Sequence, residues 1–242
     1  VHFGPTNTFW NDFPTLNAYV ARCQSFLQKG KHDNDILFYY PFYDLISVPA
    51  KQGLLEHFES DVKESGIPSF YPSAQSLLEK GYTFDYISDL QLIELYYSNY
   101  MLNTGFSSYK TVVLPECKFI PLETFIHLFR LAEEGAVIII QHSLPGDVPG
   151  LWNLEPRQAA LKSLKDQLDF KQVSGYSFSR TDIGEGSFFL GDNMDEMLSF
   201  TGIKRETMVD CGLQFIRRVD EQGPYYFILN QGSDTIDRWV SV

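Results

Sequence analysis

Three short runs of consecutive apolar residues stand out along the chain. They occupy 35–41, 111–115 and 136–140, where the sequences are DILFYYP, TVVLP and AVIII. Continuous apolar runs of this length are typical of strands that are buried on both faces of a parallel sheet. We therefore predict a parallel sheet built around these three segments.

Helical periodicity separates the last two of these runs. Within 121–134 the apolar residues recur every three or four positions, and Gly135 follows at the place of a C-cap glycine. A strand, a helix and a strand joined by short connections predict parallel pairing through a right-handed crossover. Three further helices are predicted over 12–29, 72–80 and 154–170.

Details of these helices extend the prediction. Asn153 is the expected N-cap of the helix over 154–170, and a short strand is predicted at 82–87. Cys23 falls on the apolar face of the helix over 12–29, so we expect a buried thiol there. The segment 90–106 fits either a helix or a small group of strands.

Alternation of apolar and polar residues replaces these patterns after Thr207. Turn signals at 221–224 and 230–233 separate the alternating segments, the last of which ends around Trp239 and Val240. Antiparallel hairpins are therefore predicted for the C-terminal part. The glycines of 184–186 precede a strand-like run, so they predict a hairpin turn and not a phosphate-binding loop.

Composition and charge narrow the possible partners. The 242 residues are 44% apolar and 21% charged, as in an ordinary globular protein of one large or two modest domains. Acidic residues outnumber basic ones 31 to 19, and a net charge of -12 repels phosphate backbones and anionic lipid heads. This charge leads us to expect no nucleic-acid partner. We expect no membrane partner either, since no apolar run approaches the roughly 20 residues of a membrane span.

Candidate chemistry gathers where the predicted strands end, because ligands of open parallel sheets bind at the carboxyl ends of their strands. Cys117 could act as a nucleophile with His142 as its base. Alternatively, Asp44, Asp89 and Glu116 could supply a carboxylate pair, which inverting glycoside hydrolysis places roughly 6.5–9.5 Å apart. The strand-end residues are Tyr43, Asp44, Ser88, Asp89, Glu116, Cys117, Gln141 and His142.

Local sequence argues against both hypotheses. Glu116 and Lys118 flank Cys117, whereas a nucleophile on a sharp strand-to-helix turn needs small neighbours. We expect Cys117 to pack under the helix that begins at Pro121, and we assign no catalytic residue. Acidic residues at strand ends are most often solvated or cap helices.

The remaining cysteine and histidine patterns predict no metal site. The three cysteines are far apart and odd in number, which fits neither a disulfide scaffold nor a zinc site. His127 is expected on the surface or the flank of its helix. The other isolated histidines considered as metal ligands are His2, His32 and His57.

The order of several segments resembles glycoside hydrolase family 106, the alpha-L-rhamnosidases. Each segment is short, and their succession covers nearly the whole chain. They are HFGPTNTFW at 2–10, YVARCQSFL at 19–27, NDILFYYP at 34–41, LLEKGYTFDYI at 77–87, YKTVVLP at 109–115, GAVI at 135–138, PGL at 149–151, FIRR at 215–218 and YFILNQG at 226–232.

The resemblance implies a domain organisation. Residues 1–30 would be the end of a catalytic barrel, 31–205 a flavodoxin-like accessory domain, and 206–242 the first strands of a β-sandwich. The expected fold class is therefore α/β, a flavodoxin-like and mostly parallel sheet with flanking helices, plus a short antiparallel segment at the C-terminus. The domain also resembles accessory domains of other barrel glycosidases, which are related to glutamine amidotransferases without their nucleophile.

The implied parent is a large secreted or periplasmic bacterial enzyme that releases terminal L-rhamnose from plant polysaccharides. It would use two barrel carboxylates with inversion and calcium in the active site, all upstream of Val1, so this chain itself holds no cofactor. The loop 2–10 could touch the sugar through Asn7 or Trp10. Alternatively, Trp10 anchors the first helix.

We thus expect the enzymatic function to belong to a longer protein of which this chain is a part. The chain starts without Met and ends on a strand-like segment, so we expect a piece of a glycosidase that packs against an upstream barrel. The alternatives are a carbohydrate-binding or architectural module, with Trp10, Trp152 or Trp239 at the sugar, and a Cys-dependent amidotransferase-like hydrolase.

Overall fold

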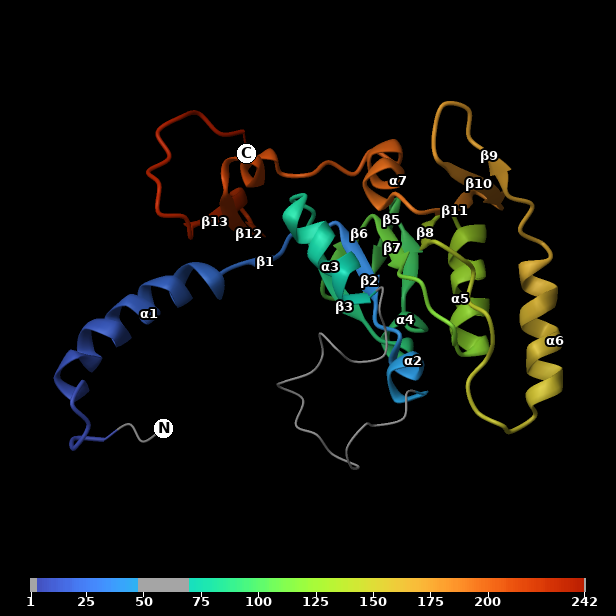
Figure 1. Cartoon of the computed structure of the whole chain (residues 1–242), viewed down its shortest axis with the longest axis horizontal. Helices are drawn as coiled ribbons and strands as arrows, with labels where there is room; N and C mark the ends of the chain where they lie inside the picture. The colour runs from blue at the N-terminus through green and yellow to red at the C-terminus, as the bar shows by residue number, and fades with distance from the viewer. Residues whose placement is uncertain (1–3, 48–69, 242) are drawn as a thin grey trace.

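A seven-stranded, mostly parallel sheet forms the centre of the protein, which we describe from a computed structural model covering residues 4–47 and 70–241 (Figure 1). The strand order is β3-β2-β7-β8-β11-β10-β9. Pairing is parallel from β3 to β11, whereas β10 and β9 are added antiparallel. The strands are β2 (Ile36–Tyr39), β3 (Phe84–Ile87), β7 (Thr111–Leu114), β8 (Val137–Gln141), β9 (Lys171–Gln172), β10 (Phe178–Ile183) and β11 (Gly186–Gly191).

The three apolar runs of the sequence are the central strands. Every residue of β2 and β7 is buried, and so are four of the five residues of β8. Parallel pairing of β2 with β7 and of β7 with β8 confirms the predicted arrangement. Because successive side chains point to opposite faces, Leu37 and Tyr39 enter one core cluster while Ile36 and Phe38 enter the other.

Helices cover both faces of this sheet (Figure 1). On one face, α5 (Leu122–Glu133) and α6 (Leu154–Lys165) contribute to the core that contains Leu37. On the other face, α3 (Phe70–Glu79) and α7 (Met194–Phe200) pack against the core that contains Ile36. The helices predicted over 72–80 and 121–134 are therefore present.

The helix predicted over 154–170 ends earlier than expected, and Asn153 stands at the predicted N-cap position but its side chain does not cap the helix. α6 ends at Lys165, and Asn153 has a φ of 48° with no side-chain cap hydrogen bond. A capping side chain needs an extended backbone at that position, which the left-handed conformation does not provide. Instead, Arg157 donates hydrogen bonds to the carbonyl oxygens of Pro149, Gly150 and Trp152 and holds the preceding loop.

The ambiguous segment 90–106 contains both predicted alternatives in succession. A short helix comes first, and a three-stranded antiparallel sheet of order β4-β5-β6 follows it. A second short helix, α2 (Phe42–Ser47), comes directly after β2. The elements of the segment are α4 (Asp89–Leu92), β4 (Tyr96–Ser98), β5 (Met101–Asn103) and β6 (Ser108–Tyr109).

The predicted hairpins are present at two places. β12 (Leu213–Asp220) and β13 (Gly223–Asn230) follow the 3-10 helix η2 (Thr207–Cys211), and β1 (Lys31–His32) pairs with β12. The strand expected around Trp239 is wrong, because 231–241 pairs with no described strand. The Trp239 side chain is fully exposed.

Glycines make the other hairpin, between β10 and β11, pack tightly. Gly184 has a φ of +58°, and a Cβ atom there would lie 2.4 Å from the carbonyl oxygen of Glu133. A Cβ atom on Gly186 would lie 2.2 Å from the carbonyl oxygen of Ala136. The predicted hairpin turn at 184–186 is confirmed, and it rests directly on the end of α5 and the start of β8.

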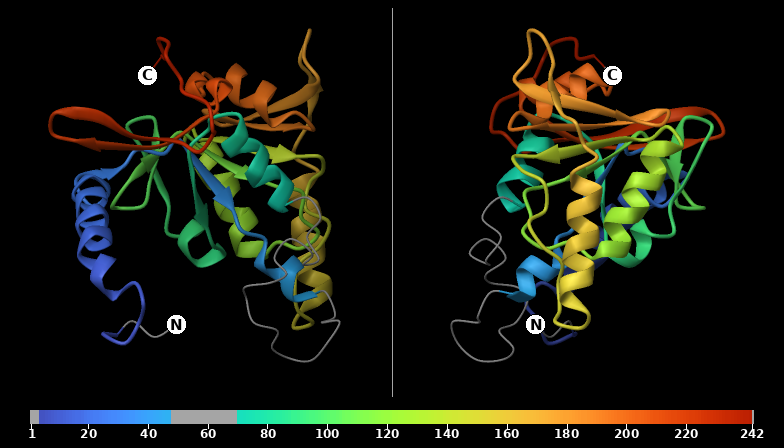
Figure 2. Two further views of the ribbon diagram at one scale, coloured as in Figure 1. Left: turned by 60° about the vertical axis from the view of Figure 1, so that its left-hand side comes forward. Right: turned by 90° about the vertical axis from the view of Figure 1, so that its right-hand side faces the viewer.

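The first helix extends away from the sheet (Figure 2). α1 (Phe13–Leu27) follows the 3-10 helix η1 (Trp10–Asp12) and confirms the predicted helix, but none of its residues is buried. The expectation of a buried Cys23 is therefore wrong, since no described element covers that face of the helix. Tyr225 of β13 donates a hydrogen bond to the carbonyl oxygen of Lys29 and so joins the end of α1 to the hairpin.

His127 is buried and does not lie on the surface of its helix as expected. Its side chain is only 6% exposed, because the residues after α4 cover that side of α5. Nε2 donates to the carbonyl oxygen of Leu95 at 2.8 Å, and Arg130 donates to Nδ1 at 3.1 Å. His32 contacts Arg218, while His2 and His57 lie outside the described residues.

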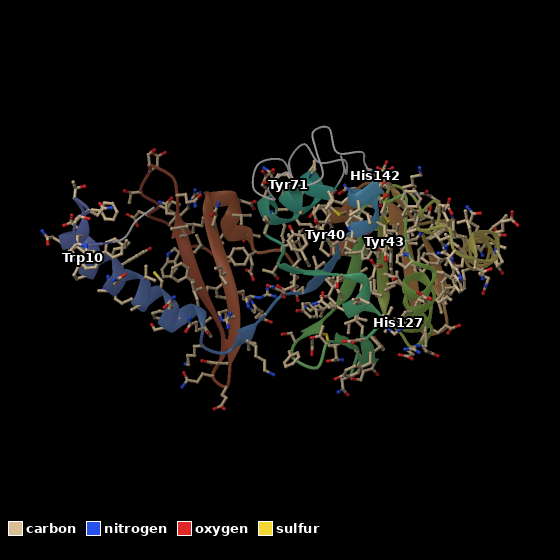
Figure 3. The ribbon with its side chains drawn as sticks, turned by 90° about the horizontal axis from the view of Figure 1, so that it is seen from below. Trp10, Tyr40, Tyr43, Tyr71, His127 and His142 are labelled. Carbon is tan, nitrogen blue, oxygen red and sulfur yellow. The ribbon has the colours of Figure 1, made fainter. Side chains whose placement is uncertain are left out.

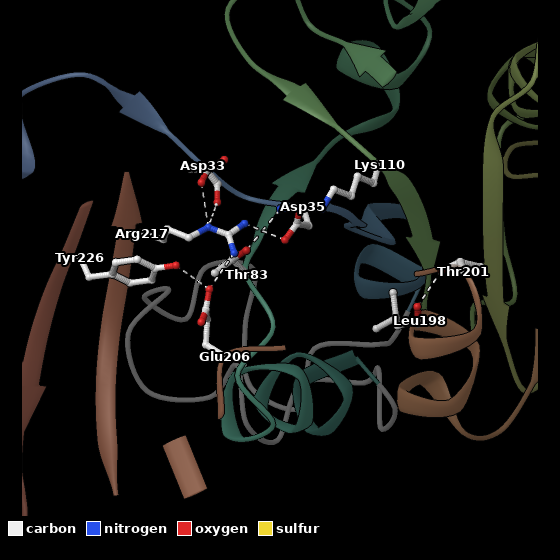
Figure 4. Close-up of polar contacts among 9 residues, drawn as sticks. All are labelled: Asp33, Asp35, Thr83, Lys110, Leu198, Thr201, Glu206, Arg217 and Tyr226. Carbon is white, nitrogen blue, oxygen red and sulfur yellow. Dashed lines mark hydrogen bonds and ion pairs between the residues drawn. The ribbon is translucent and has the colours of Figure 1, made fainter. Parts of the chain in front are cut away.

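Arg217 joins the hairpin to the large sheet (Figure 4). Its guanidinium binds Asp33 at 2.9 Å, Asp35 at 2.7 Å and Glu206 at 3.0 Å. Tyr226 donates to the same Glu206 carboxylate at 2.9 Å. Burial lowers the pKa of Arg217, but the hydrogen bonds and charges of these carboxylates outweigh burial and raise it.

Membrane insertion finds no support in the described helices. None of those within 4–47 and 70–241 combines the length and apolarity that a bilayer span requires.

Replacing Arg217 should destabilise the fold strongly. Arg217→Met leaves Asp33, Asp35 and Glu206 close together without their shared cation, and loss of one partner of a buried ion pair costs about 3–5 kcal/mol. Urea unfolding measures this change. Arg180→Met removes the exposed pair with Asp182 and serves as the control, with an expected cost below about 1 kcal/mol. Equal effects of the two substitutions would contradict this role for Arg217.

His127 should make stability depend on pH. Burial lowers the pKa of His127 below its ordinary 6.5, while the bond to Leu95 opposes the shift. The unfolded chain therefore takes up the proton first, so the contribution of His127 is complete above pH 6.5 and is lost as the pH falls through and below that value. Unfolding of His127→Gln, followed from pH 8 to pH 5, should show a shallower loss of stability than the wild type. Parallel curves would argue against this contribution.

Candidate functional site

The carboxyl ends of β2, β3, β7 and β8 meet at one edge of the sheet, as the parallel pairing requires. Figure 3 shows Tyr40, Tyr43, Tyr71 and His142 in one half of its view, with His127 in the other half. Tyr40 follows β2 and His142 follows β8. The strand-end residues named from the sequence therefore share one edge, where they form two separate groups.

The first group surrounds the Cys117 thiol. Cys117 is buried, and burial raises its pKa first, followed by the negative charges of Asp44, Asp89 and Glu116. The acids proposed as a possible carboxylate pair therefore lie close enough for their charges to act on this thiol, although Glu116 itself is exposed. Burial and these charges keep the thiol protonated.

Each of the two aspartates is used by the protein itself. Both oxygens of Asp44 accept hydrogen bonds from the backbone N–H groups of Lys118 and Phe119, at 3.0 to 3.3 Å. Burial raises the pKa of Asp44, and these bonds oppose the shift. The carboxylate thus fixes the loop that follows β7.

Asp89 has a similar structural task. Its Oδ1 accepts from the hydroxyl of Tyr39 at 2.9 Å and from that of Thr124 at 2.7 Å. Burial raises the pKa of Asp89, while both hydroxyls oppose the shift. The carboxylate therefore ties β2 to the first turns of α4 and α5, which is a positioning task rather than acid–base chemistry.

The Cys117 and His142 hypothesis finds no physical support in this arrangement. A nucleophilic cysteine needs a cation or an imidazole that stabilises its thiolate, whereas the neighbours of Cys117 are acidic. Nδ1 of His142 instead lies 2.9 Å from Oδ1 of Asp192, which follows β11. The two residues expected to act together thus belong to different groups on the edge.

The second group lines a pocket of about 250 Å³ at the ends of β8 and β11. Ser73 of α3 donates to Oε1 of Gln141 at 2.6 Å, and Lys80 pairs with Asp195 at 2.9 Å. Burial opposes ionisation of Asp195, but hydrogen bonds from Tyr82 and Lys80 lower its pKa overall. The pocket thus combines hydrogen-bond donors and acceptors that other elements already hold in place.

Sequence reasoning found only part of this pocket. Gln141 and His142 were named as strand-end residues, but Asp192 and Asn193 were missed. The available signal was the polar pair directly after the strand-like run 187–190, which we interpreted only as one side of a hairpin.

Asn7 and Trp10, the predicted sugar contacts, lie far from this edge. Figure 3 places Trp10 near one end of the molecule, well away from His142, which lies beside the large sheet. Oδ1 of Asn7 accepts from the N–H of Phe9, and the Trp10 ring stacks on Phe13 at 5.8 Å between centroids. This contact agrees with Trp10 anchoring the first helix, and the ring remains 39% exposed. Sugar contact through either residue stays a prediction.

A metal centre finds no donor set in the part of the chain that the structure describes. Within 4–47 and 70–241, no group of three or more histidine, cysteine or acidic side chains could hold an ion.

Comparison with known proteins shows that this chain is similar to one part of longer proteins. A curated relative from Formosa agariphila, provisionally named a beta-glucuronidase, is 28% identical over 229 residues, which are 94% of this chain and 17% of the relative. The solved rhamnosidase from Novosphingobium sp. PP1Y is similar over 96% of this chain and 20% of its own, with a TM-score of 0.67 and 20% identity. A beta-galactosidase from Bacillus circulans sp. alkalophilus matches 85% of this chain and 37% of its own, with a TM-score of 0.53 and 11% identity.

Both structural similarities establish a shared fold, and the chain spans about a fifth or less of the curated relative and of the solved rhamnosidase. Family membership comes from the sequence. The model of the alpha-L-rhamnosidase family matches residues 58–239, which is well over half of the chain. This chain therefore belongs to glycoside hydrolase family 106, the alpha-L-rhamnosidase family.

Proposed function

We propose that this chain is a non-catalytic accessory region of a larger enzyme that hydrolyses terminal alpha-L-rhamnosidic bonds of plant polysaccharides. The observation that carries the proposal is that the two strand-edge aspartates Asp44 and Asp89 are engaged inside the protein. Asp44 binds two backbone N–H groups and Asp89 binds two hydroxyls, so neither is free to act on a sugar. The family match and the small share of the relatives that the chain spans support the same interpretation.

The apolar face of α1 supports packing against an upstream catalytic barrel. The side chains along this face are exposed in the described structure, and a stripe of this kind is favourable only when another surface covers it. We assign the barrel as that surface, since the relatives are several times longer than this chain. The stripe consists of Leu16, Tyr19, Val20 and Phe26.

Further parts of the proposal concern the fold and the parent protein. The parallel strands β3, β2, β7, β8 and β11 have the order 2-1-3-4-5 by their position in the chain, which supports a flavodoxin-like domain within 31–205. The boundaries at 30 and 205, a secreted or periplasmic location and calcium in the parent barrel follow from the family resemblance. They belong to the same proposal.

Hydrolysis of an aryl alpha-L-rhamnoside tests the accessory role. The chain of 242 residues should give no turnover, whereas the longer natural protein that contains it should release the aryl alcohol. An accessory region adds no transition-state stabilisation of its own, because the reacting carboxylates lie elsewhere. Turnover by the 242 residues alone would contradict the proposal.

Cys117→Ala in the longer protein separates this role from a Cys-dependent hydrolase. The accessory role predicts kcat within about twofold of the wild type, because the buried thiol touches no substrate. A Cys-dependent hydrolase predicts near-complete loss. Thermal unfolding of the same variant shows whether a modest decrease in kcat comes from lost packing.

A further inference from the structure

His142 adopts a backbone conformation that side chains avoid. Its φ is 63°, and the N–H of Ser143 donates to the carbonyl oxygen of Gln141 at 2.8 Å across it. An i to i+2 hydrogen bond around a residue of positive φ is a rare and strained γ-turn. Glycine at this position would remove the strain. Strained residues of this kind cluster at functional sites, so the His142 imidazole is a candidate functional group.

The strained turn brings the imidazole to the pocket at the ends of β8 and β11. Since a carboxylate only accepts hydrogen bonds, the contact with Asp192 places a proton on Nδ1 of His142. In the neutral ring, Nε2 then remains as an acceptor. The γ-turn and Asp192 together fix the orientation of this ring at the rim of the pocket.

Gln141 supplies a donor deeper in the same pocket. Its residue is only 7% exposed, and its Oε1 accepts from Ser73. None of the described residues accepts a hydrogen bond from its Nε2. Since no buried side-chain atom among the described residues lacks a partner, this nitrogen is accessible from the pocket that Gln141 lines. The amide N–H groups of Gln141 are therefore available to a molecule in the pocket.

The charges around the pocket select against anions. Lys80 is neutralised by Asp195, and Asp192 adds a further negative charge at the rim. A phosphate or a carboxylate would meet this negative field, whereas neutral hydroxyl groups can both donate to carboxylates and accept from amides. The volume of about 250 Å³ lies just below the range of drug-sized sites, which suits one sugar ring and not a chain.

We propose that this pocket binds a single neutral monosaccharide unit, with Gln141, His142 and Asp192 as its recognition residues. The proposal rests on the proposed function, because that function makes neutral sugars the ligands this protein meets. It adds a binding site outside the catalytic barrel. Gln141 donates to a sugar hydroxyl, while His142 and Asp192 accept from neighbouring hydroxyls.

Titration with L-rhamnose, followed by calorimetry and by the NMR signals of the His142 ring, tests the site. D-galactose and D-glucose are the neutral comparison probes, and D-glucuronate is the anionic one. L-rhamnose or another neutral sugar should bind and shift the ring signals, and D-glucuronate should not. Gln141→Leu and Asp192→Asn should each weaken binding about tenfold, since each removes one directed hydrogen bond.

His142→Gly has a matched control in Asn153→Gly, because Asn153 also has a positive φ but lies outside the pocket. Both substitutions should leave Tm unchanged or raise it, since glycine relieves the left-handed backbone. Only His142→Gly should lose sugar binding. Wild-type affinity in this variant, or no binding of any of the three neutral sugars, would overturn the proposal.

The two proposals fail in different experiments. Absence of sugar binding, with rhamnoside hydrolysis intact in the longer protein, contradicts the pocket alone. Hydrolysis by the 242 residues alone contradicts the accessory role and leaves the binding measurement unaffected.

Discussion

The guanidinium of Arg217 holds the segment before β2 against the C-terminal hairpin. Arg217 lies on β12, while its partners Asp33 and Asp35 precede β2 and Glu206 precedes η2. The entry to the first central strand and the exit from the large sheet are therefore fixed by the same side chain. A single planar group with five donors can satisfy three carboxylates at once, which the point charge of a lysine cannot do with the same geometry.

This cluster also explains how an acidic protein tolerates close carboxylates. With 31 acidic and 19 basic residues, the acids outnumber the cations that could pair with them. Lys110 adds a second cation to Asp35 at 2.7 Å, so the most crowded acids lie where the positive charges are. Near Cys117 the acids are stabilised in a different way. Asp44 accepts hydrogen bonds from backbone N–H groups, and Asp89 accepts them from hydroxyls.

Sequence periodicity predicted the strands that are buried on both faces and the helix that buries one regular stripe. β2, β7 and β8 were found because strands buried on both faces leave continuous apolar runs, and α5 because its stripe has helical spacing. The failures concern contacts made by distant segments. His127 is buried by residues near Leu95, and Cys23 is only partly buried because no described element covers α1; neither outcome is encoded in local spacing.

The site was predictable to the same extent. Parallel topology brings strand-end residues to one edge, so the presence of Asp44, Asp89 and Glu116 at the same edge could be foreseen. Their chemical state could not, since it depends on burial and on hydroxyl partners such as Tyr39 and Thr124. Asp192 was missed because β11 pairs in parallel with β8 as well as in a hairpin with β10, and the sequence pattern indicated only the hairpin.

The hairpin between β10 and β11 has a consequence for recognising distant relatives of this domain. Its two glycines rest on carbonyl oxygens of Glu133 and Ala136, where any larger residue would displace the main chain. Apolar core positions accept exchanges among residues of similar volume, so they diverge quickly. In this chain the motif lies between β10 and β11 and consists of a glycine, one further residue and a second glycine. It should therefore persist as a sequence signature after the core residues themselves have diverged.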